Sequence, residues 1–223
     1  MLLLLPNLLS PESTPYDTFT PSIAKAVSTL NGLIAESPKG GRIFLKHFGR
    51  LDLPQTLLNE HTKDLAELLE PLKKGECWGL VSDCGLPCLA DPGRELVLKA
   101  RALNIPVKAY SGPSSIPLAL MLSGLPAQAF TFHGYLEREP ERLVSQLLTL
   151  QTQKITHLFI EAPYRNEKLL TLLIKSLRDN TMLSVASDLT GPAETVHTHP
   201  IRHWKKLPLP PIDKKPAIFL FYP

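Results

Sequence analysis

The sequence predicts an α/β protein with two α/β domains, each built on a mainly parallel or mixed sheet. Short apolar segments typical of buried strands alternate along the chain with longer segments typical of helices. The chain has 223 residues, 43% of them hydrophobic, which is enough for one large or two small packed domains. Ser111–Ser115 (SGPSS) is a natural joint. We therefore expect domains at residues 1–112 and 113–223.

The first expected element is a strand in the apolar run Met1–Leu5, which Pro6 ends. We do not interpret this run as a signal peptide, because no cation precedes it and no small-residue cleavage pattern follows. A Pro/Ser/Thr-rich loop then extends to Thr20. The other elements expected in the first domain are helices at 22–30, 42–48, 63–73 and 92–103, and strands at 33–36, 78–82 and 107–110.

The second domain restarts at the joint with a helix that continues through Met121. The remaining expected elements are strands at 130–132, 155–160, 183–188 and 217–222, helices at 140–150 and 166–177, and a hairpin segment around 194–204.

Composition excludes several classes of protein. The net charge of +3 suits an anionic partner but falls far short of a nucleic-acid-binding footprint on its own. No segment approaches the apolar length of a membrane span, so we expect a soluble cytoplasmic protein without a membrane partner. The three cysteines, Cys77, Cys84 and Cys88, lie close together and are odd in number, as expected for reduced cytosolic thiols.

No metal site is expected. Cys84 and Cys88 lack a second pair or matching histidines, which disfavours zinc. His197 and His199 share one strand face, but without a third placed ligand an exposed hairpin is the favoured interpretation.

The stretch Leu80–Arg94 (LVSDCGLPCLADPGR) is the most informative part of the chain. It follows the expected buried strand, and we interpret Asp91 as the N-cap of the next helix with Pro92 in its first turn. A carboxylate, a glycine and a proline constrain the loop between them, so that it can present backbone donors at the carboxyl end of a strand. Ligands of open α/β sheets bind at that end.

Four segments that each follow an expected strand belong together: Ser82–Gly93, Gly112–Ser115, Phe132–Tyr135 and Glu161–Arg165. Loops that leave the same sheet edge converge on one crevice, and a crevice between domains is the usual place for a small ligand. Either of the short Gly-Pro-Ser-Ser and Phe-His-Gly-Tyr segments alone is better explained as turn and cap chemistry. The four together favour a site.

In order and spacing, these segments match a known pattern. Ser82–Pro87 stands where that pattern has Ser-Asp-Ala-Gly-Thr-Pro, Asp91–Gly93 is its Asp-Pro-Gly, and Ser111–Ser114 stands at its Pro-Gly-Pro-Ser. Phe132–Leu136 and Glu161–Arg165 stand at its Phe-x-Gly-Phe/Tyr-Leu and Glu-Ser-Pro-His-Arg. The chain thereby resembles the tetrapyrrole methylase-like superfamily of S-adenosylmethionine (SAM) methyltransferases. It is most similar to the branch that methylates a ribose 2'-hydroxyl in small-subunit ribosomal RNA, and the similarity covers nearly the whole chain.

The resemblance implies SAM bound in a cleft between the two domains, in a homodimer. It points to Asp83, Cys84, Gly85 and Pro87 around the methionine end of SAM, with Ser114 and Ser115 from the joint, and to Phe132, His133 and Leu189 on the nucleoside side. Because a sulfonium is a cation, a nearby carboxylate such as Asp83 is a sensible partner. Without the resemblance, Asp83 is better interpreted as an Asx-turn or cap.

Methyl transfer is an in-line displacement in which the protein mainly aligns the acceptor and excludes water. A base helps a weakly nucleophilic ribose hydroxyl, and Glu36, His61 and Glu161 are the candidates on family-matched loops. His61 could equally cap the next helix, and Glu161 with Arg165 is better interpreted as an internal ion pair.

The chain departs from the ribosomal pattern in ways that bear on the substrate. The opening Pro-x-Gly-Asn loop is Pro6–Pro11 here, without a glycine, and Glu36–Lys39 (ESPK) replaces Glu-Asp-Thr-Arg. Lys39 or Arg42 is the candidate to take the place of the arginine in that pattern. We expect both of them to contact substrate, together with Arg165 and with Tyr164, which replaces a histidine of the pattern. The sequence ends at Pro223 without the usual extra segment, which indicates a short divergent subgroup.

Two basic stretches are candidate RNA contacts. One comprises Arg202–Lys206 with Lys214 and Lys215, and the other comprises Lys39, Arg42, Lys46, His47 and Arg50. A solvated edge explains the first equally well.

The resemblance predicts a SAM-dependent 2'-O-methyltransferase of small-subunit ribosomal RNA, with ribosomal RNA or the small subunit as partner. One alternative is a superfamily enzyme that methylates a tetrapyrrole or another small molecule, although the Gly-x-Gly-Pro-Gly opening of such enzymes is absent. The other is a catalytically silent RNA- or ribosome-binding protein on the same scaffold.

Overall fold

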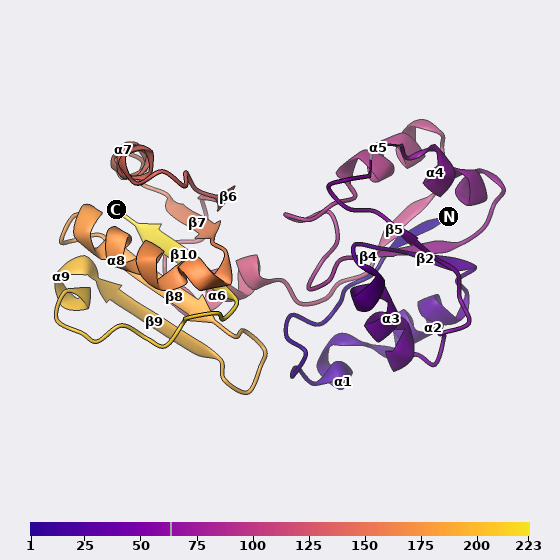
Figure 1. The fold of residues 1–223 in the computed structure, drawn as a ribbon, viewed down its shortest axis with the longest axis horizontal. Helices are drawn as coiled ribbons and strands as arrows, with labels where there is room; N and C mark the ends of the chain where they lie inside the picture. The colour runs from indigo at the N-terminus through magenta and orange to yellow at the C-terminus, as the bar shows by residue number, and fades with distance from the viewer. Residues whose placement is uncertain (63) are drawn as a thin grey trace. The chain divides into compact units, whose positions relative to one another are not determined.

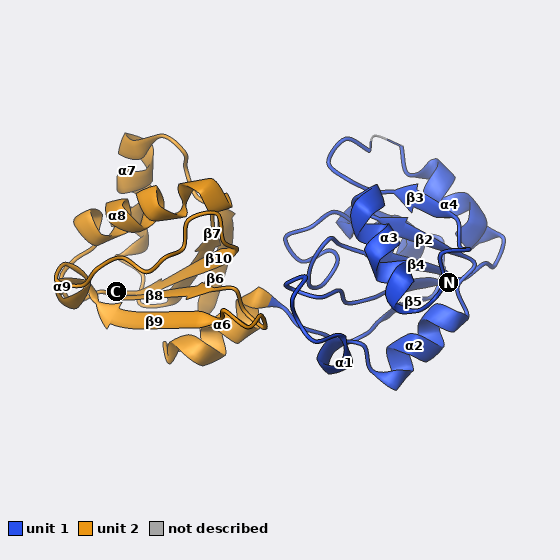
Figure 2. Ribbon diagram, turned by 60° about the horizontal axis from the view of Figure 1, so that its bottom comes forward, with its two compact units in different colours: residues 1–114 blue, residues 115–223 orange. Residues whose placement is uncertain are grey.

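The structure, a computed structural model, describes residues 1–62 and 64–223. The chain forms two compact units, unit 1 (residues 1–114) and unit 2 (residues 115–223), coloured blue and orange in Figure 2. Each unit has its own five-stranded sheet. The chain passes from one unit to the other at Ser114, inside the expected joint and two residues after the expected boundary at 112.

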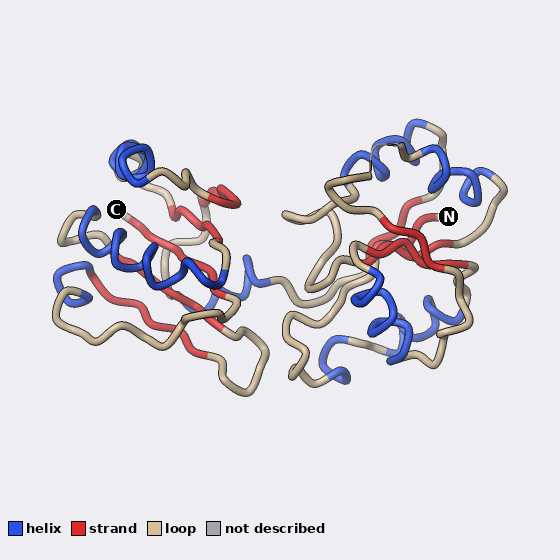
Figure 3. Tube along the Cα trace, in the orientation of Figure 1, coloured by secondary structure: helices blue, strands red, loops and turns tan. Residues whose placement is uncertain are grey.

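Unit 1 alternates strands with helices, as Figure 3 shows. Its elements are β1 (Leu2–Leu4), α1 (Pro15–Thr18), α2 (Pro21–Ser28), β2 (Gly32–Ala35), α3 (Pro38–His47), β3 (Gln55–Leu57), α4 (Ala66–Lys73), β4 (Trp78–Val81), α5 (Arg94–Ala102) and β5 (Val107–Ala109).

The sheet of unit 1 is parallel throughout, in the order β3-β2-β4-β1-β5. Its inner strands β1, β2 and β4 are apolar on both faces, because α4 and α5 cover one face and α2 and α3 the other (Figure 1). Leu2 and Ile34 face the first helix pair, whereas Leu3 and Leu33 face the second. All five strands therefore end at the same edge of the sheet, and the loops that leave this carboxyl edge are brought together.

Several expected elements of unit 1 need correction. The second helix begins at Pro38 rather than at 42, because the Ser37 hydroxyl accepts a hydrogen bond from the Gly40 amide and Pro38 occupies the first helical position. The short strand β3 and the helical turn α1 were not expected. The expected start of the next helix at Lys63 lies outside the described residues, and α4 begins at Ala66.

The helix after the Leu80–Arg94 loop also starts later than predicted. Asp91 is not its N-cap, because Gly93, with φ of 131°, occupies that position and α5 begins at Arg94. Only glycine adopts this backbone conformation readily, and a Cβ there would lie 2.6 Å from Cys88 Sγ. Asp91 and Pro92 thus remain in the loop.

Unit 2 consists of α6 (Ser115–Ser123), β6 (Phe130–Tyr135), α7 (Pro140–Leu150), β7 (Thr156–Ile160), the 3₁₀ turn η1 (Pro163–Arg165), α8 (Asn166–Ser176), β8 (Met182–Ser187), β9 (Thr195–Pro200), α9 (Ile201–Trp204) and β10 (Ala217–Tyr222).

The sheet of unit 2 is mixed, in the order β6-β7-β10-β8-β9. Only β6 and β7 form a parallel pair, and the other neighbours are antiparallel. Since β8 runs antiparallel to β10, and β10 to β7, the strands β6, β7 and β8 end at one edge. The main core lies where α7, α8 and α9 pack on one face of the sheet, around Phe159 and Phe219.

The structure confirms a hairpin in the last third of the chain, formed by β8 and β9, but the segment from Ile201 to Trp204 is a helical turn. Trp204 is 2% exposed and its indole N–H donates to the Leu183 carbonyl. Although Trp204 lies within the basic stretch Arg202–Lys206, its ring is therefore part of the core and is not available to stack on a base. In the same unit, β6 extends to Tyr135 beyond its expected end at 132, through an irregularity after Phe132.

Candidate functional site

The loops after β1 and β4 form one joined structure at the carboxyl edge of unit 1. Asn7 is buried, and its side-chain amide donates to the Ser82 carbonyl at 2.9 Å and to the Asp83 carbonyl at 3.2 Å. The backbone completes the connection, because the Asn7 amide donates to the Gly85 carbonyl and the Gly85 amide donates to the Leu8 carbonyl. The altered first loop therefore supports the Ser82–Gly85 segment without the glycine of the ribosomal pattern.

Asp83 lies at the amino end of α3. Ser37 Oγ donates to Asp83 Oδ1 at 2.7 Å, and the Asp83 amide donates to Glu36 Oε2 at 3.0 Å. A Cβ on Gly40 would overlap Asp83 Oδ1, so the close approach of the carboxylate to the helix depends on this glycine. The segment after β2 thus holds Asp83 at both its carboxylate and its backbone amide.

Three carboxyl groups come together here: Glu36, Asp83 and Asp91. Burial, followed by the negative charge of Glu36, raises the pKa of Asp91 to about 6, and the charge of Asp83 adds to this shift. Burial and the same acidic surroundings raise the pKa of the Cys84 thiol to about 11. Cys84 is therefore a protonated thiol at neutral pH and cannot serve as a thiolate nucleophile.

The other predicted cofactor residues of unit 1 border the same loops. Gly85 has φ of 71°, and a Cβ on it would lie 3.6 Å from the Pro113 carbonyl oxygen. Pro87 and Ser114 are buried, and Ser115 begins α6 of unit 2. The loop after β4 thus approaches the segment after β5, as expected for neighbouring loops of a parallel sheet.

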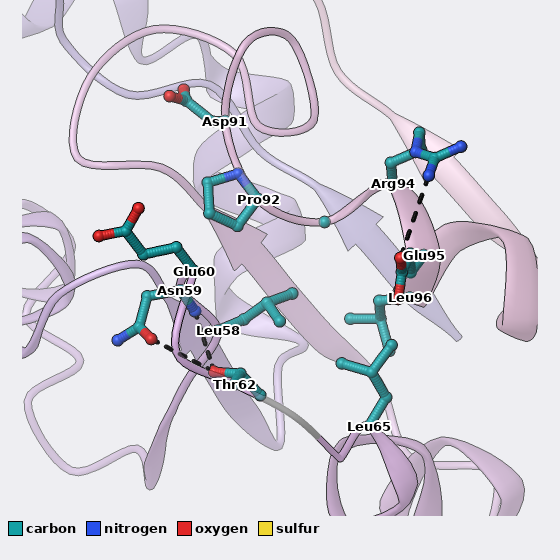
Figure 4. Close-up of a pocket in the computed structure, with 11 residues that line it drawn as sticks. Leu58, Asn59, Glu60, Thr62, Leu65, Asp91, Pro92, Arg94, Glu95 and Leu96 are labelled. Atoms are coloured by element: carbon teal, nitrogen blue, oxygen red, sulfur yellow. Dashed lines mark hydrogen bonds and ion pairs between the residues drawn. The ribbon is translucent and has the colours of Figure 1, made fainter.

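A pocket of about 290 Å³ opens beside these loops, and sequence reasoning did not predict it. Figure 4 shows Asp91 and Pro92 on one wall and Asn59, Glu60 and Thr62 on the facing wall. The second wall is the loop after β3, a strand too short and too exposed to be recognised from its sequence. The Asp-Pro-Gly motif was a usable signal for the first wall, but it was interpreted as a helix cap.

The structure places the three candidate bases differently. His61 is 85% exposed at its side chain, and its amide donates to Asn59 Oδ1, so Asn59 and not His61 caps this turn. Glu36 lies inside the cluster of carboxyl groups and accepts from the Asp83 amide. Glu161 is in unit 2, where its Oε2 lies 3.2 Å from Arg165 Nε, which confirms the expected ion pair.

The predicted substrate residues are divided between the units. Lys39 and Arg42 are exposed on α3 of unit 1. In unit 2, Tyr164 is 71% exposed on η1, whereas Arg165 is held by Glu161 and by the Arg138 carbonyl. Lys39, Arg42 and Tyr164 thus have accessible side chains.

A histidine pair lies on the sheet of unit 2. His133 Nε2 lies 3.0 Å from Nδ1 of the buried His157, with one ring nitrogen as donor and the other as acceptor. Burial lowers the pKa of both rings, and the charge of His157 lowers the pKa of His133 further. The neighbouring predicted cofactor residues are Phe132, half-buried on β6, and Leu189, buried after β8.

We expect this pair to make the stability of unit 2 depend on pH. Both folded-state pKa values lie below the ordinary value of 6.5, so on acidification the unfolded chain takes up protons that the native pair does not. We expect the free energy of unfolding to fall as the pH drops below about 6.5, and thermal melts at about pH 8 and about pH 5.5 measure it. In His133→Gln, which removes one titrating ring, the decrease becomes smaller. An unchanged decrease contradicts the assignment.

The two basic stretches are only partly available for an anionic ligand. Lys205 pairs with Asp179, Lys215 pairs with Asp188, and Arg202 donates to Asn180. Arg50 does not belong with the other cations of the second stretch, because it lies beyond α3 and donates to carbonyls near the end of α2. The stretch that stays exposed on α3 contains Lys39, Arg42, Lys46 and His47.

His197 and His199 do not lie on an exposed hairpin, because both pack against the buried Trp204. Within residues 1–62 and 64–223, no group of three His, Cys, Asp or Glu side chains is arranged to hold a metal ion. In the same ranges, no helix is both long enough and apolar enough to cross a membrane.

Comparison with known proteins decides the family. Residues 23–204 match the Tetrapyrrole (Corrin/Porphyrin) Methylases. The chain belongs to this family. Its members are SAM-dependent methyltransferases, so the chain is an enzyme of this class with SAM as its cofactor.

Curated relatives carry the name ribosomal RNA small subunit methyltransferase I. The chain is 36% identical to one from Xylella fastidiosa over 86% of its own length and 71% of the relative's. It is 33% identical to one from Synechocystis and 30% identical to one from Bacillus subtilis. These two matches cover 77% and 79% of the chain but only 62% of each relative. The chain therefore spans about two thirds of the length of these relatives.

Solved structures confirm the fold class. The methyltransferase CobJ superposes with a TM-score of 0.67 at 15% identity, covering 98% of this chain and 92% of that one. Diphthine synthase gives a TM-score of 0.66 at 14% identity, covering 99% and 88%. Uroporphyrin-III-C-methyltransferase from Thermus thermophilus gives 0.55 at 16%, covering 99% and 91%.

Proposed function

We propose that this methyltransferase acts on a ribose 2'-hydroxyl of small-subunit ribosomal RNA. The observation that carries the proposal is the identity of up to 36%, over most of the chain, to relatives named ribosomal RNA small subunit methyltransferase I. The 2'-hydroxyl is the acceptor that the resemblance of the motifs implies.

The carboxyl edge of unit 1 fits the charge of SAM. When bound, SAM supplies a methyl group activated by a positively charged sulfur. Glu36, Asp83 and Asp91 place negative charge at this edge, and within the described residues no lysine or arginine forms an ion pair with them. A sulfonium or ammonium group placed beside Asp83 relieves the repulsion between its carboxylate and that of Glu36. Asp83, fixed by Ser37, is our candidate for the contact with the methionine end.

The remaining predicted residues complete the proposal. The binding loops in unit 1 are shaped by Cys84, Gly85, Pro87 and Ser114. In unit 2 we propose Ser115 at the joint, and on the nucleoside side of SAM we propose Phe132, His133 and Leu189. Lys39 and Arg42 are exposed cations suited to RNA phosphates. The exposed Tyr164 offers a ring for stacking on a base, and Arg165 supports this loop through Glu161.

We further propose a cytoplasmic homodimer, since ribosomal RNA is a cytoplasmic substrate and the resemblance implies two subunits. The apolar helix α6 exposes Met121 and Leu122, which suits a subunit contact. Light scattering of the purified protein tests the oligomeric state, and a monomer at micromolar concentration contradicts the dimer.

Incubation with methyl-labelled SAM tests the function. Small ribosomal subunits and naked ribosomal RNA from a strain that lacks this protein are the acceptors, and subunits from the parent strain are the matched control. We expect label in one nucleotide of the small-subunit RNA from the deletion strain only, resistant to alkaline cleavage on its 3' side. Label in a small molecule instead supports the tetrapyrrole-type alternative. RNA binding without SAM binding or label supports the silent-protein alternative.

A further inference from the structure

Asp91 is a carboxyl group that the sequence did not assign to any chemistry. It is one of the residues that line the 290 Å³ pocket, and the lining also includes Asn59, Glu60 and Thr62 from the loop after β3 (Figure 4). On its other side it interacts with the Ser82 side chain and with the charges of Glu36 and Asp83, the group proposed to contact SAM. Asp91 therefore lies between a cavity large enough for part of a nucleoside and the proposed cofactor loops.

We infer that Asp91 is the general base of the methyl transfer, accepting the proton of the acceptor hydroxyl in this pocket. The inference rests on the proposed function. It replaces the three bases expected from the sequence, because His61 is turned to solvent, Glu161 is held by Arg165, and Glu36 is occupied by the Asp83 amide.

Asp91 as the proton acceptor accounts for every bond, electron pair and proton of the methyl transfer. The ribose oxygen forms a bond to the methyl carbon as the bond from that carbon to sulfur breaks, and the electron pair of the broken bond stays on sulfur. The sulfonium becomes a neutral thioether, and the hydroxyl proton passes to the Asp91 carboxylate. No metal ion or further reactant is required.

The surroundings of Asp91 suit a base at neutral pH. Glu36 faces it from the segment after β2, Asp83 and Cys84 from the loop after β4, and Glu60 from the loop after β3. Arg94 and Glu95 at the start of α5 line the same pocket, with Arg94 Nη2 4.0 Å from Glu95 Oε1. Burial and the acidic neighbours raise the pKa of Asp91 to about 6. It is thus mostly ionised at pH 7 and more basic than an ordinary aspartate.

Asp91→Asn tests the inference, because it keeps the shape and removes the base. Single-turnover transfer to the small-subunit RNA, at saturating SAM, is followed from about pH 5 to about pH 9. In the wild type we expect the rate to rise through about pH 6 and then level off. In Asp91→Asn we expect the rate to be reduced by roughly 100-fold or more and not to rise through about pH 6. The Kd for SAM should stay within about threefold of the wild-type value. The matched control is Asp17→Asn, an exposed aspartate on α1, with an unchanged profile.

Stability gives a readout that does not depend on activity. A raised folded-state pKa means that Asp91 contributes stability below about pH 4 that is lost as the pH rises through about 6. Asp91→Asn should therefore melt at the same or a higher temperature than wild type at about pH 8, as expected for a charge kept for function. A lower melting temperature at pH 8 indicates a structural role and overturns the inference.

The other outcomes are also decisive. A wild-type rate and pH profile in Asp91→Asn overturn the inference and leave the proposed function standing. Loss of SAM affinity in this variant makes Asp91 a cofactor ligand and also overturns it. No label with the wild-type protein overturns the proposed function and the inference together. Should the asparagine variant not fold, Asp91→Glu replaces it and must keep the rise near pH 6 at a reduced rate.

Discussion

Asp83→Ala is expected to weaken SAM binding by about 2–3 kcal/mol, roughly 30- to 150-fold in Kd, without unfolding the protein. The carboxylate is held at the amino end of α3 by Ser37, and its loss removes a preorganised countercharge for the cationic cofactor. The fold should persist, because Asp83 is exposed and contributes to the repulsion that raises the pKa of Asp91. Calorimetric titration with SAM measures the affinity, and thermal melting measures the fold.

Two further variants separate charge from shape at Asp83. Asp83→Asn keeps an acceptor for the Ser37 hydroxyl but removes the charge, so we expect most of the affinity to be lost in it as well. Asp213→Ala removes an exposed aspartate of unit 2 and should bind SAM like the wild type. Wild-type affinity in Asp83→Ala would refute the placement of the methionine end at this loop.

Gly40→Ala is expected to lower SAM affinity about tenfold or more while making α3 itself more favourable. The added methyl group would overlap Asp83 Oδ1, so the carboxylate has to leave the Ser37 hydroxyl. Alanine is meanwhile favoured over glycine inside a helix by about 1 kcal/mol. The same titration and melting measurements apply, and we expect a lost ligand without a lost fold.

Gly49→Ala is the matched control and should show the opposite pattern. Gly49 follows α3 with φ of 65° and has open space around its Cβ position. Alanine there costs about 1–2 kcal/mol of stability, because the left-handed conformation disfavours a side chain, but it leaves Asp83 untouched. If Gly40 acts through Asp83, the double variant Gly40→Ala/Asp83→Ala binds SAM no worse than Asp83→Ala alone. Additive losses would contradict that coupling.

Much of the fold follows from local patterns in the sequence. Strands such as Trp78–Val81 are short apolar runs bounded by turn residues, and their alternation with helices indicates a parallel sheet. Boundaries were less predictable. Ser37 and Gly93 set the starts of α3 and α5 through a cap and a positive φ, so that these helices begin at Pro38 and Arg94 rather than at the predicted residues.

The candidate site divides in the same way. The Asp83 loop and the joint are contiguous motifs, so the sequence reveals them. Asn7, Gly40 and the facing wall of the Asp91 pocket act across long separations in the chain, and no local pattern records such contacts. Trp204 shows the same limit, since its basic neighbours in the sequence are typical of a surface while its ring fills the core of unit 2.

By itself, the sequence determined two things about this protein. Its apolar pattern indicated two α/β domains, and the resemblance of its motifs in their order pointed to a methyltransferase of the tetrapyrrole methylase family, because both are properties of the linear chain. The tertiary structure alone decided which polar groups meet: Asn7 and Ser37 around Asp83, His133 with His157, and Asp91 beside the pocket. The physical reason is that hydrogen bonds and pKa shifts depend on distance and burial in space, and only the folded chain fixes these.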